Sequence, residues 1–269
     1  MTERAQKINV RTSTTIPIAS IRREVQPWHI RTSTRAEDVE RLARAIENTK
    51  EVVPITVVQV GEGNYDYVTG LIRIQALERL GESHIPAIVL TTHDDEALLR
   101  TALAEQEVRF PLGTLERGWA ITRLLVMRQE RGLPAAQNRV AEELGLDRGD
   151  VSTAIRAARA IPFDRARELA REYDLELTQI AALPRTPLRA IARTEDVEER
   201  DRLIEAALSA VASGESPTRA VAEARELSGS GTRTGLSHVV TALSRIMGWV
   251  RRFTRVIRLR TRAWYQRLW

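Results

Sequence analysis

The chain has 269 residues, with 41 Lys and Arg against 36 Asp and Glu, and it contains no cysteine. This length allows two domains with separate cores, and the absence of cysteine excludes disulfides, thiolate metal sites and thiol catalysis. The N-terminal residues lack the apolar core of a signal peptide, and no run approaches the roughly 18 apolar residues that cross a bilayer. We therefore expect a cytoplasmic protein.

The net charge of +5 is unevenly distributed. Residues 238–269 hold eight arginines and no acidic residue, which leaves 33 basic and 36 acidic side chains in the other 237 residues. The body of the chain is therefore close to neutral, which excludes a uniformly basic surface that coats nucleic acid. Any contact between the body and nucleic acid must come from a local patch.

The first 112 residues predict a small mixed α/β domain. Amphipathic periodicity and β-rich alternation indicate helices at 36–49 and 71–80 and strands at 54–60, 65–69 and 86–90. Gly81 follows the second helix and suits the left-handed residue that ends a helix.

From Asp94 onward the sequence is almost entirely helical. The expected segments are 94–108, 114–131, 135–144, 148–160, 164–173, 176–182, 187–192, 196–212 and 217–227. Residues 113–227 are therefore expected to form an all-helical second domain, followed by a Gly- and Ser-rich linker at 228–237 and a basic amphipathic helix at 238–269. The expected fold class is α+β.

Residues 135–160 have the spacing of a helix-turn-helix. Ala141 is small where the first helix must approach the second, and Gly145 follows four residues later, where the turn needs an unhindered backbone. Asp147 can cap the second helix by accepting a backbone N–H. The apolar contacts between the helices are expected from Val140, Leu144, Leu146, Val151, Ala154 and Ile155.

This spacing places four polar residues on the outer face of the second helix. They are Arg148, Ser152, Thr153 and Arg156, and a recognition helix presents such side chains to base edges and phosphates. The alternative is an ordinary helical hairpin with a solvated arginine face. We favour double-stranded DNA as the partner because the small, glycine and apolar positions all agree with the motif.

Two further motifs lie in the first domain. Thr69-Gly70-Leu71-Ile72-Arg73 joins a strand to a helix, where free N–H groups and an arginine can bind a phosphate, although a turn glycine and a surface arginine explain it equally well. Residues 105–109, Glu-Gln-Glu-Val-Arg, end a helix. They form either a simple i,i+4 ion pair or a carboxylate and amide that can hold hydrated Mg²⁺ beside phosphates.

The order of these parts resembles the ParB family of chromosome and plasmid partition proteins, whose first domain is of the ParB/sulfiredoxin type. The resemblance covers about residues 16–227. Besides the helix-turn-helix, it is carried by Ile16-Pro17-Ile18, Gln26-Pro27-Trp28, Gly70-Leu71-Ile72-Arg73-Ile74-Gln75-Ala76, Glu105-Gln106-Glu107-Val108-Arg109 and Ser216-Pro217-Thr218-Arg219-Ala220.

Members of that family bind CTP in the first domain, load at a palindromic DNA site and close into a sliding clamp. For the matched positions, the resemblance implies Gly70, Arg73 and Arg109 as nucleotide-binding residues, Glu105 and Gln106 as ligands of Mg²⁺, and Gln26 as the catalytic candidate near the attacking water. It also implies a homodimer, a ParA-type ATPase partner and association with the nucleoid. Whether this chain hydrolyses CTP stays open.

The chain departs from the family pattern at four positions. Leu71 and Ile72 replace a glutamate and an arginine, Trp28 replaces an arginine, and Gln106 replaces the metal-binding asparagine. The site has therefore lost charge that phosphates would use. These departures favour one alternative, a site-specific transcriptional regulator without CTP gating. A second alternative is a nucleotide-dependent enzyme, but the missing cysteine and the helix-turn-helix argue against it.

The basic tail repeats Leu243, Val250, Ile257 and Trp264 every seven residues, which predicts one amphipathic helix. We rank dimerisation first, combined with nonspecific binding of DNA phosphates by the arginines. Attachment of residues 243–269 to a membrane surface ranks third, and an unfolded tail remains the alternative to all three.

Overall fold

The computed structural model describes residues 12–31, 34–109 and 112–229 of the chain. The chain divides into two compact units, Met1–Ala222 and Glu223–Trp269, and the described part of the second unit is the end of helix α11 (Pro217–Gly229). Within the described residues, no helix combines the length and apolarity needed to cross a membrane.

The first part of the chain forms a mixed sheet of five strands in the described residues. In spatial order the strands are β1 (Thr12–Pro17), β5 (His84–Leu90), β3 (Ile55–Gly61), β4 (Asn64–Thr69) and β2 (Ile21–Arg22). β1 pairs antiparallel with β5, and β3 pairs antiparallel with β4, whereas the β5–β3 and β4–β2 pairs are parallel. A 3₁₀ turn, η1 (Ile18–Ser20), separates β1 from β2.

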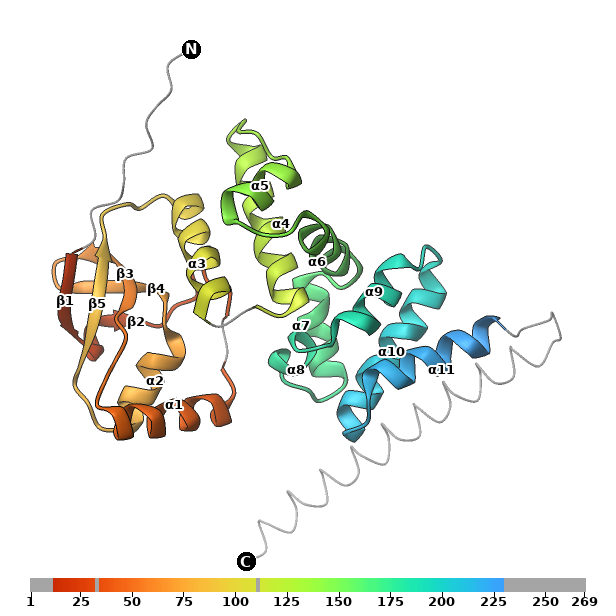
Figure 1. The fold of residues 1–269 in the computed structure, drawn as a ribbon, viewed down its shortest axis with the longest axis horizontal. Helices are drawn as coiled ribbons and strands as arrows, with labels where there is room; N and C mark the ends of the chain where they lie inside the picture. The colour runs from red at the N-terminus through yellow and green to blue at the C-terminus, as the bar shows by residue number, and fades with distance from the viewer. Residues whose placement is uncertain (1–11, 32–33, 110–111, 230–269) are drawn as a thin grey trace, which may run out of the picture. The chain divides into compact units, whose positions relative to one another are not determined.

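Helices cover both faces of this sheet because its strands bury alternate residues on opposite sides. On one face, Val57 and Tyr67 share a core with helices α1 (Ala36–Thr49) and α2 (Leu71–Arg79), which pack side by side (Figure 1). On the other face, Val58 and Val68 pack in a cluster with Leu98 and Leu99 of helix α3 (Asp95–Arg109). The sheet is therefore a buried middle layer whose strand ends carry the connecting loops.

The rest of the described chain is helical. Its elements are α4 (Thr114–Glu130), α5 (Gln137–Leu144), α6 (Arg148–Ala160), α7 (Phe163–Glu172), α8 (Leu177–Ala181), α9 (Arg185–Arg193), α10 (Val197–Ser213) and α11. α4 is the central helix, because its buried Ile121 and Leu124 belong to the same hydrophobic cluster as buried residues of α3, α5 and α6.

The structure confirms the predicted α+β class and the main elements. The predicted strands correspond to β3, β4 and β5, and the helix predicted at 71–80 is α2, after which Gly81 adopts a φ of 77°. β1 and β2 escaped prediction because β1 is an edge strand rich in exposed Thr and Ser, and β2 has only two residues. α11 extends to Gly229, so the predicted linker begins in a helix. The rest of that linker and the predicted tail helix at 238–269 lie outside the described residues.

Candidate functional site

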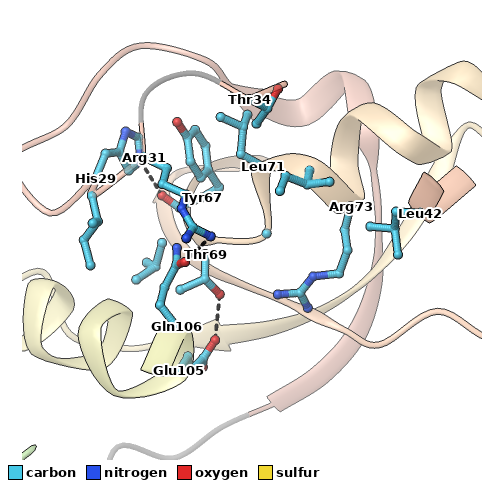
Figure 2. A pocket seen from close by; sticks show the side chains of 14 residues that line it. His29, Arg31, Thr34, Leu42, Tyr67, Thr69, Leu71, Arg73, Glu105 and Gln106 are labelled. Atoms are coloured by element: carbon cyan, nitrogen blue, oxygen red, sulfur yellow. Dashed lines mark hydrogen bonds between the residues drawn. The ribbon is translucent and has the colours of Figure 1, made fainter. Parts of the chain in front are cut away.

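A glycine shapes the turn where β4 passes into α2. Gly70 has a φ of 108°, a conformation that residues with a side chain rarely adopt, and a Cβ there would lie 2.4 Å from Cγ2 of Ile55. The glycine is therefore required by both backbone conformation and space. The predicted strand, glycine and helix order of residues 69–73 is present, and this turn borders a pocket (Figure 2).

Arg73 of α2 lines the same pocket, but its guanidinium already binds backbone. Its Nη1 donates to the carbonyl oxygen of Val53 at 3.2 Å and to that of Pro54. Arg73 is 9% exposed. A phosphate could recruit it only by competing with these carbonyl groups, which are neutral acceptors and hence weaker partners than an anion.

Glu105, near the end of α3, faces the sheet from the other side of the pocket. One carboxylate oxygen accepts a hydrogen bond from the hydroxyl of Thr56 at 2.7 Å. The other accepts one from the hydroxyl of Thr69 at 2.6 Å (Figure 2). Both threonines are buried. Two fixed donors hold the carboxylate at the floor of the pocket, and each carboxylate oxygen has a second lone pair with which it can accept a further bond.

The next residue, Gln106, is held by an arginine that the sequence did not single out. Arg31, in the loop before α1, donates from Nη1 to the Gln106 Oε1 atom at 3.0 Å. It also donates from Nε and Nη2 to the two carboxylate oxygens of Glu116 in α4, at 3.0 and 3.1 Å. Arg31 thus joins the pocket to the first turn of α4.

His29 forms the wall of the pocket next to Arg31. Its ring stacks on Tyr67 with centroids 3.8 Å apart, its Nε2 lies 2.6 Å from the Tyr67 carbonyl oxygen, and its Nδ1 accepts from the Gln26 N–H. These contacts fit a neutral ring with the proton on Nε2. Burial lowers the pKa of His29 below its usual value, and this effect outweighs the opposing hydrogen bond to the Tyr67 carbonyl.

The pocket brings together most of the candidate nucleotide site. Gly70, Arg73, Glu105 and Gln106 all line it, whereas Gln26 does not. The side chain of Arg109, the last residue of α3, lies outside the described part of the structure. The lining also includes four apolar residues from α1, α2 and the preceding loop: Ile30, Leu42, Leu71 and Ile72.

The chemistry of this lining is that of an anion pocket with one fixed carboxylate. Arg31 and Arg73 supply the positive charge and Glu105 the negative charge. Within the described residues, no group of three or more His, Asp or Glu side chains is placed to hold a metal ion. Any divalent cation bound at Glu105 would therefore need most of its ligands from water or from a bound anion, as Mg²⁺ commonly does.

The structure contains the predicted helix-turn-helix. α5 ends at Gly145, which has a φ of 66°, and Asp147 caps α6 by accepting a hydrogen bond from the N–H of Asp150 at 2.9 Å. Val140 and Ala141 of α5 are fully buried. On α6 the predicted contacts Val151, Ala154 and Ile155 are buried as well, so the two helices pack as their sequence spacing requires.

The outer face of α6 carries the predicted polar residues. Arg148 and Arg156 are exposed, and Arg156 donates from Nη2 to the hydroxyl of Ser152 at 3.0 Å. Thr153 uses its hydroxyl to bond the Gly149 carbonyl oxygen. The two arginines can therefore reach a partner, while Ser152 and Thr153 are half-buried on the same helix.

Two contacts that support α6 were not expected. Gly118 of α4 lies against α6 so closely that an added Cβ would be 2.1 Å from the carbonyl oxygen of Ala154. Arg185, at the start of α9, pairs with Asp150 in the first turn of α6 at 2.6 Å. A glycine inside a predicted helix was the only sequence signal for the first contact, and nothing in the sequence indicated the second.

The comparisons with known proteins agree with this arrangement. Residues 2–106 match the family of the ParB N-terminal domain. The chain is 32% identical over 182 residues to a probable chromosome-partitioning protein ParB of Pseudomonas putida. This match covers 67% of this chain and 59% of that protein. It is 30% identical over 155 residues to a nucleoid occlusion protein of a Geobacillus species, covering 57% of this chain and 51% of that protein.

Among solved structures, the chain resembles the C-terminally truncated chromosome-partitioning protein ParB of Caulobacter crescentus, crystallised with the centromeric parS site. The identity is 25%, the match covers 79% of this chain and 99% of that chain, and the TM-score is 0.44. By contrast, the chain spans only 59% and 51% of the length of the Pseudomonas and Geobacillus relatives. It belongs to the ParB family, with a ParB N-terminal domain followed by a helical region that contains a helix-turn-helix.

Proposed function

We propose that this chain is a DNA-binding partition protein that recognises an inverted-repeat site as a dimer and is gated by CTP. The observation that carries the proposal is that one chain holds an arginine-lined pocket in a ParB N-terminal domain and a capped helix-turn-helix. The names of its relatives, a chromosome-partitioning protein and a nucleoid occlusion protein, support a role on chromosomal or plasmid DNA.

On the DNA side, we assign base recognition to the outer face of α6. Arg148 and Arg156 are the exposed cations that can bind guanine edges or phosphates, and Ser152 and Thr153 are the neutral groups between them. The remainder of the body is close to neutral, so this face must supply the specificity. A second protomer would place a second α6 on the other half of a palindrome.

On the nucleotide side, we assign the phosphates of CTP to the turn at Gly70 and to Arg73. The glycine allows a phosphate to approach the backbone at the start of α2, where N–H groups are free of helical partners. We further assign Glu105 as the residue that would hold Mg²⁺, which neutralises phosphate charge when bound. Gln106 would contribute only after releasing Arg31, because its amide oxygen accepts from that side chain.

The proposal extends to partners. A ParA-type ATPase would move the DNA complex, and residues 238–269 would hold the dimer through their apolar repeat and add nonspecific contacts through their arginines. These assignments rest on the family resemblance and on sequence, since the tail lies outside the described residues.

A transcriptional regulator without CTP gating is the second candidate. It is favoured by the apolar side chains Leu71 and Ile72 in the pocket wall and by the backbone contacts that already engage Arg73. A regulator would keep the same DNA contacts but would bind its site with equal affinity in the presence and absence of CTP.

Selection from a random pool of DNA duplexes tests the DNA assignment. We expect the wild-type chain to enrich an inverted repeat, and the Arg148→Ala and Arg156→Ala variants to bind the selected site more weakly by about 1–3 kcal/mol each. The matched control is Arg202→Ala, which removes an exposed arginine from α10 and should leave affinity unchanged. Enrichment of no sequence, or equal binding by all variants, would contradict the assignment.

A further inference from the structure

Two arginines connect one wall of the pocket to α4, one donating from α4 to the loop and the other from the loop to α4. Arg123 of α4 donates to the carbonyl oxygens of Pro27 at 2.8 Å and His29 at 2.9 Å. From the same loop, Arg31 donates back to both carboxylate oxygens of Glu116 in α4. The loop that supplies His29 and Arg31 to the pocket therefore also contacts the helix that supports the helix-turn-helix.

Arg31 has its donors committed to protein acceptors. Nε and Nη2 form a paired contact with Glu116, and Nη1 binds the amide oxygen of Gln106 at 3.0 Å. The side chains of Arg31 and Glu116 are only 21% and 16% exposed, so water screens this pair weakly. A carboxylate and a phosphate can each present a pair of oxygens to a guanidinium, so an anion in the pocket can take the place of Glu116 as the acceptor of Arg31.

Glu116 makes a second interaction besides its pair with Arg31, and a test variant must preserve it. Its Oε2 atom accepts a hydrogen bond from the backbone N–H of Gly113 at 3.0 Å, so the side chain also caps the start of α4. Glutamine performs the same capping from this position. A glutamine at 116 therefore keeps the helix cap but removes the charge that holds Arg31.

We propose that Glu116 and the anionic ligand of the pocket compete for Arg31, so that binding of the ligand releases the loop from the first turn of α4. This inference rests on the proposed nucleotide site and assigns its regulation. Arg73 is differently placed, because its Nη1 donates to the backbone carbonyl oxygens of Val53 and Pro54, which lie in the loop before β3 and not in α4. By linkage, any state of α4 that separates Glu116 from Arg31 must bind the anion more tightly.

The test is the affinity for CTP with Mg²⁺, measured by calorimetry on the full chain. Glu116→Gln should bind CTP about tenfold more tightly than wild type, because the ligand no longer competes with a carboxylate. Arg31→Gln should lose most of the affinity. The matched control is Asp94→Asn, which removes one negative charge from the Asp94–Arg131 contact, away from the pocket lining, and keeps an oxygen for the Glu96 N–H.

The outcomes separate this inference from the proposed function. If wild type binds CTP and Glu116→Gln binds no more tightly than Asp94→Asn, the competition is overturned while the nucleotide site stands. If neither wild type nor Glu116→Gln binds CTP, the nucleotide assignment fails and the competition fails with it. Tighter binding by Glu116→Gln alone supports the competition, because a purely structural Arg31–Glu116 pair would lower the affinity when broken.

A second measurement reports the movement itself. Because the sequence has no cysteine, spin labels can be attached uniquely at exposed Glu62→Cys, between β3 and β4, and Glu142→Cys on α5. We expect CTP to change the distance distribution between these labels, and Glu116→Gln to show part of that change before CTP is added. A distribution that stays the same when CTP is bound would overturn the release of α4.

Discussion

Gly118 of α4 and Ala154 of α6 are in backbone contact: a Cβ on Gly118 would lie 2.1 Å from the Ala154 carbonyl oxygen and 2.9 Å from the Ala158 Cβ. This approach is possible only for glycine, and it sets the distance between α4 and α6. Buried Trp119 beside it donates from its indole to the Ile161 carbonyl oxygen at 2.8 Å, which ties α4 to the end of α6. The position of α6 against α4 therefore depends on Gly118 and Trp119 of α4.

Gly118→Ala should lower the free energy of unfolding by about 2–3 kcal/mol, because the added methyl group must push apart two backbones rather than a flexible side chain. Denaturant unfolding measures this. Gly61→Ala is the control, since its Cβ would meet nothing closer than 3.9 Å. Equal stability of Gly118→Ala and wild type would contradict the close packing of α4 on α6.

Glu105→Gln should impair the chain in two ways. The amide can accept from only one of the two buried hydroxyls, Thr56 and Thr69, so we expect a loss of about 1–2 kcal/mol in stability. The Mg²⁺ dependence of CTP binding should disappear as well, because the only pocket-lining carboxylate among the described residues is lost.

Thr69→Val separates these two effects. It removes one hydroxyl but keeps the Glu105 carboxylate, so stability should fall while Mg²⁺ dependence persists. Calorimetry at several Mg²⁺ concentrations distinguishes the variants. Mg²⁺ dependence that survives in Glu105→Gln would show that the cation is held elsewhere.

His29 should make stability depend on pH in the weakly acidic range. Its folded-state pKa is lowered, mainly by burial, whereas the unfolded chain titrates near the ordinary value of about 6.5. Below that value the unfolded state binds the proton first, so stability is fully present above pH of about 6.5 and falls as the pH decreases toward the folded-state pKa. Denaturant unfolding between about pH 5 and 8 measures the slope.

The control for this prediction is a second histidine. His84, at the start of β5, is exposed, so His84→Gln should retain the slope, whereas His29→Gln should reduce it. An identical slope in wild type and His29→Gln would exclude His29 as the titrating group.

The sequence predicted those features that depend on neighbouring residues. The helix-turn-helix follows from the local spacing of Ala141, Gly145 and Asp147, and the turn at Gly70 follows from a glycine between a strand and a helix. The contact of Arg31 with Glu116 joins residues 85 positions apart, and it depends on how α4 packs beside the pocket. Neither periodicity nor motif spacing contains that information, so Arg31 and His29 escaped prediction.

The partners of the Arg73 side chain also could not be predicted from local sequence patterns. Its position on α2 follows from the sequence, but its bond to the Val53 carbonyl oxygen depends on the path of the loop before β3. Gln26 illustrates the reverse case, because it was assigned by resemblance and does not line the pocket. Its catalytic role stays a prediction.

Retention on closed DNA tests the proposed coupling between a CTP pocket and a DNA-binding helix in one chain. DNA carrying the selected inverted repeat is immobilised with both ends blocked, or with one end free, and bound protein is measured with and without CTP. We expect CTP to raise retention on the closed DNA well above that on the open DNA, and Arg156→Ala to abolish the difference. Equal retention on both DNAs, unchanged by CTP, would contradict the coupling and leave a simple site-specific DNA-binding protein.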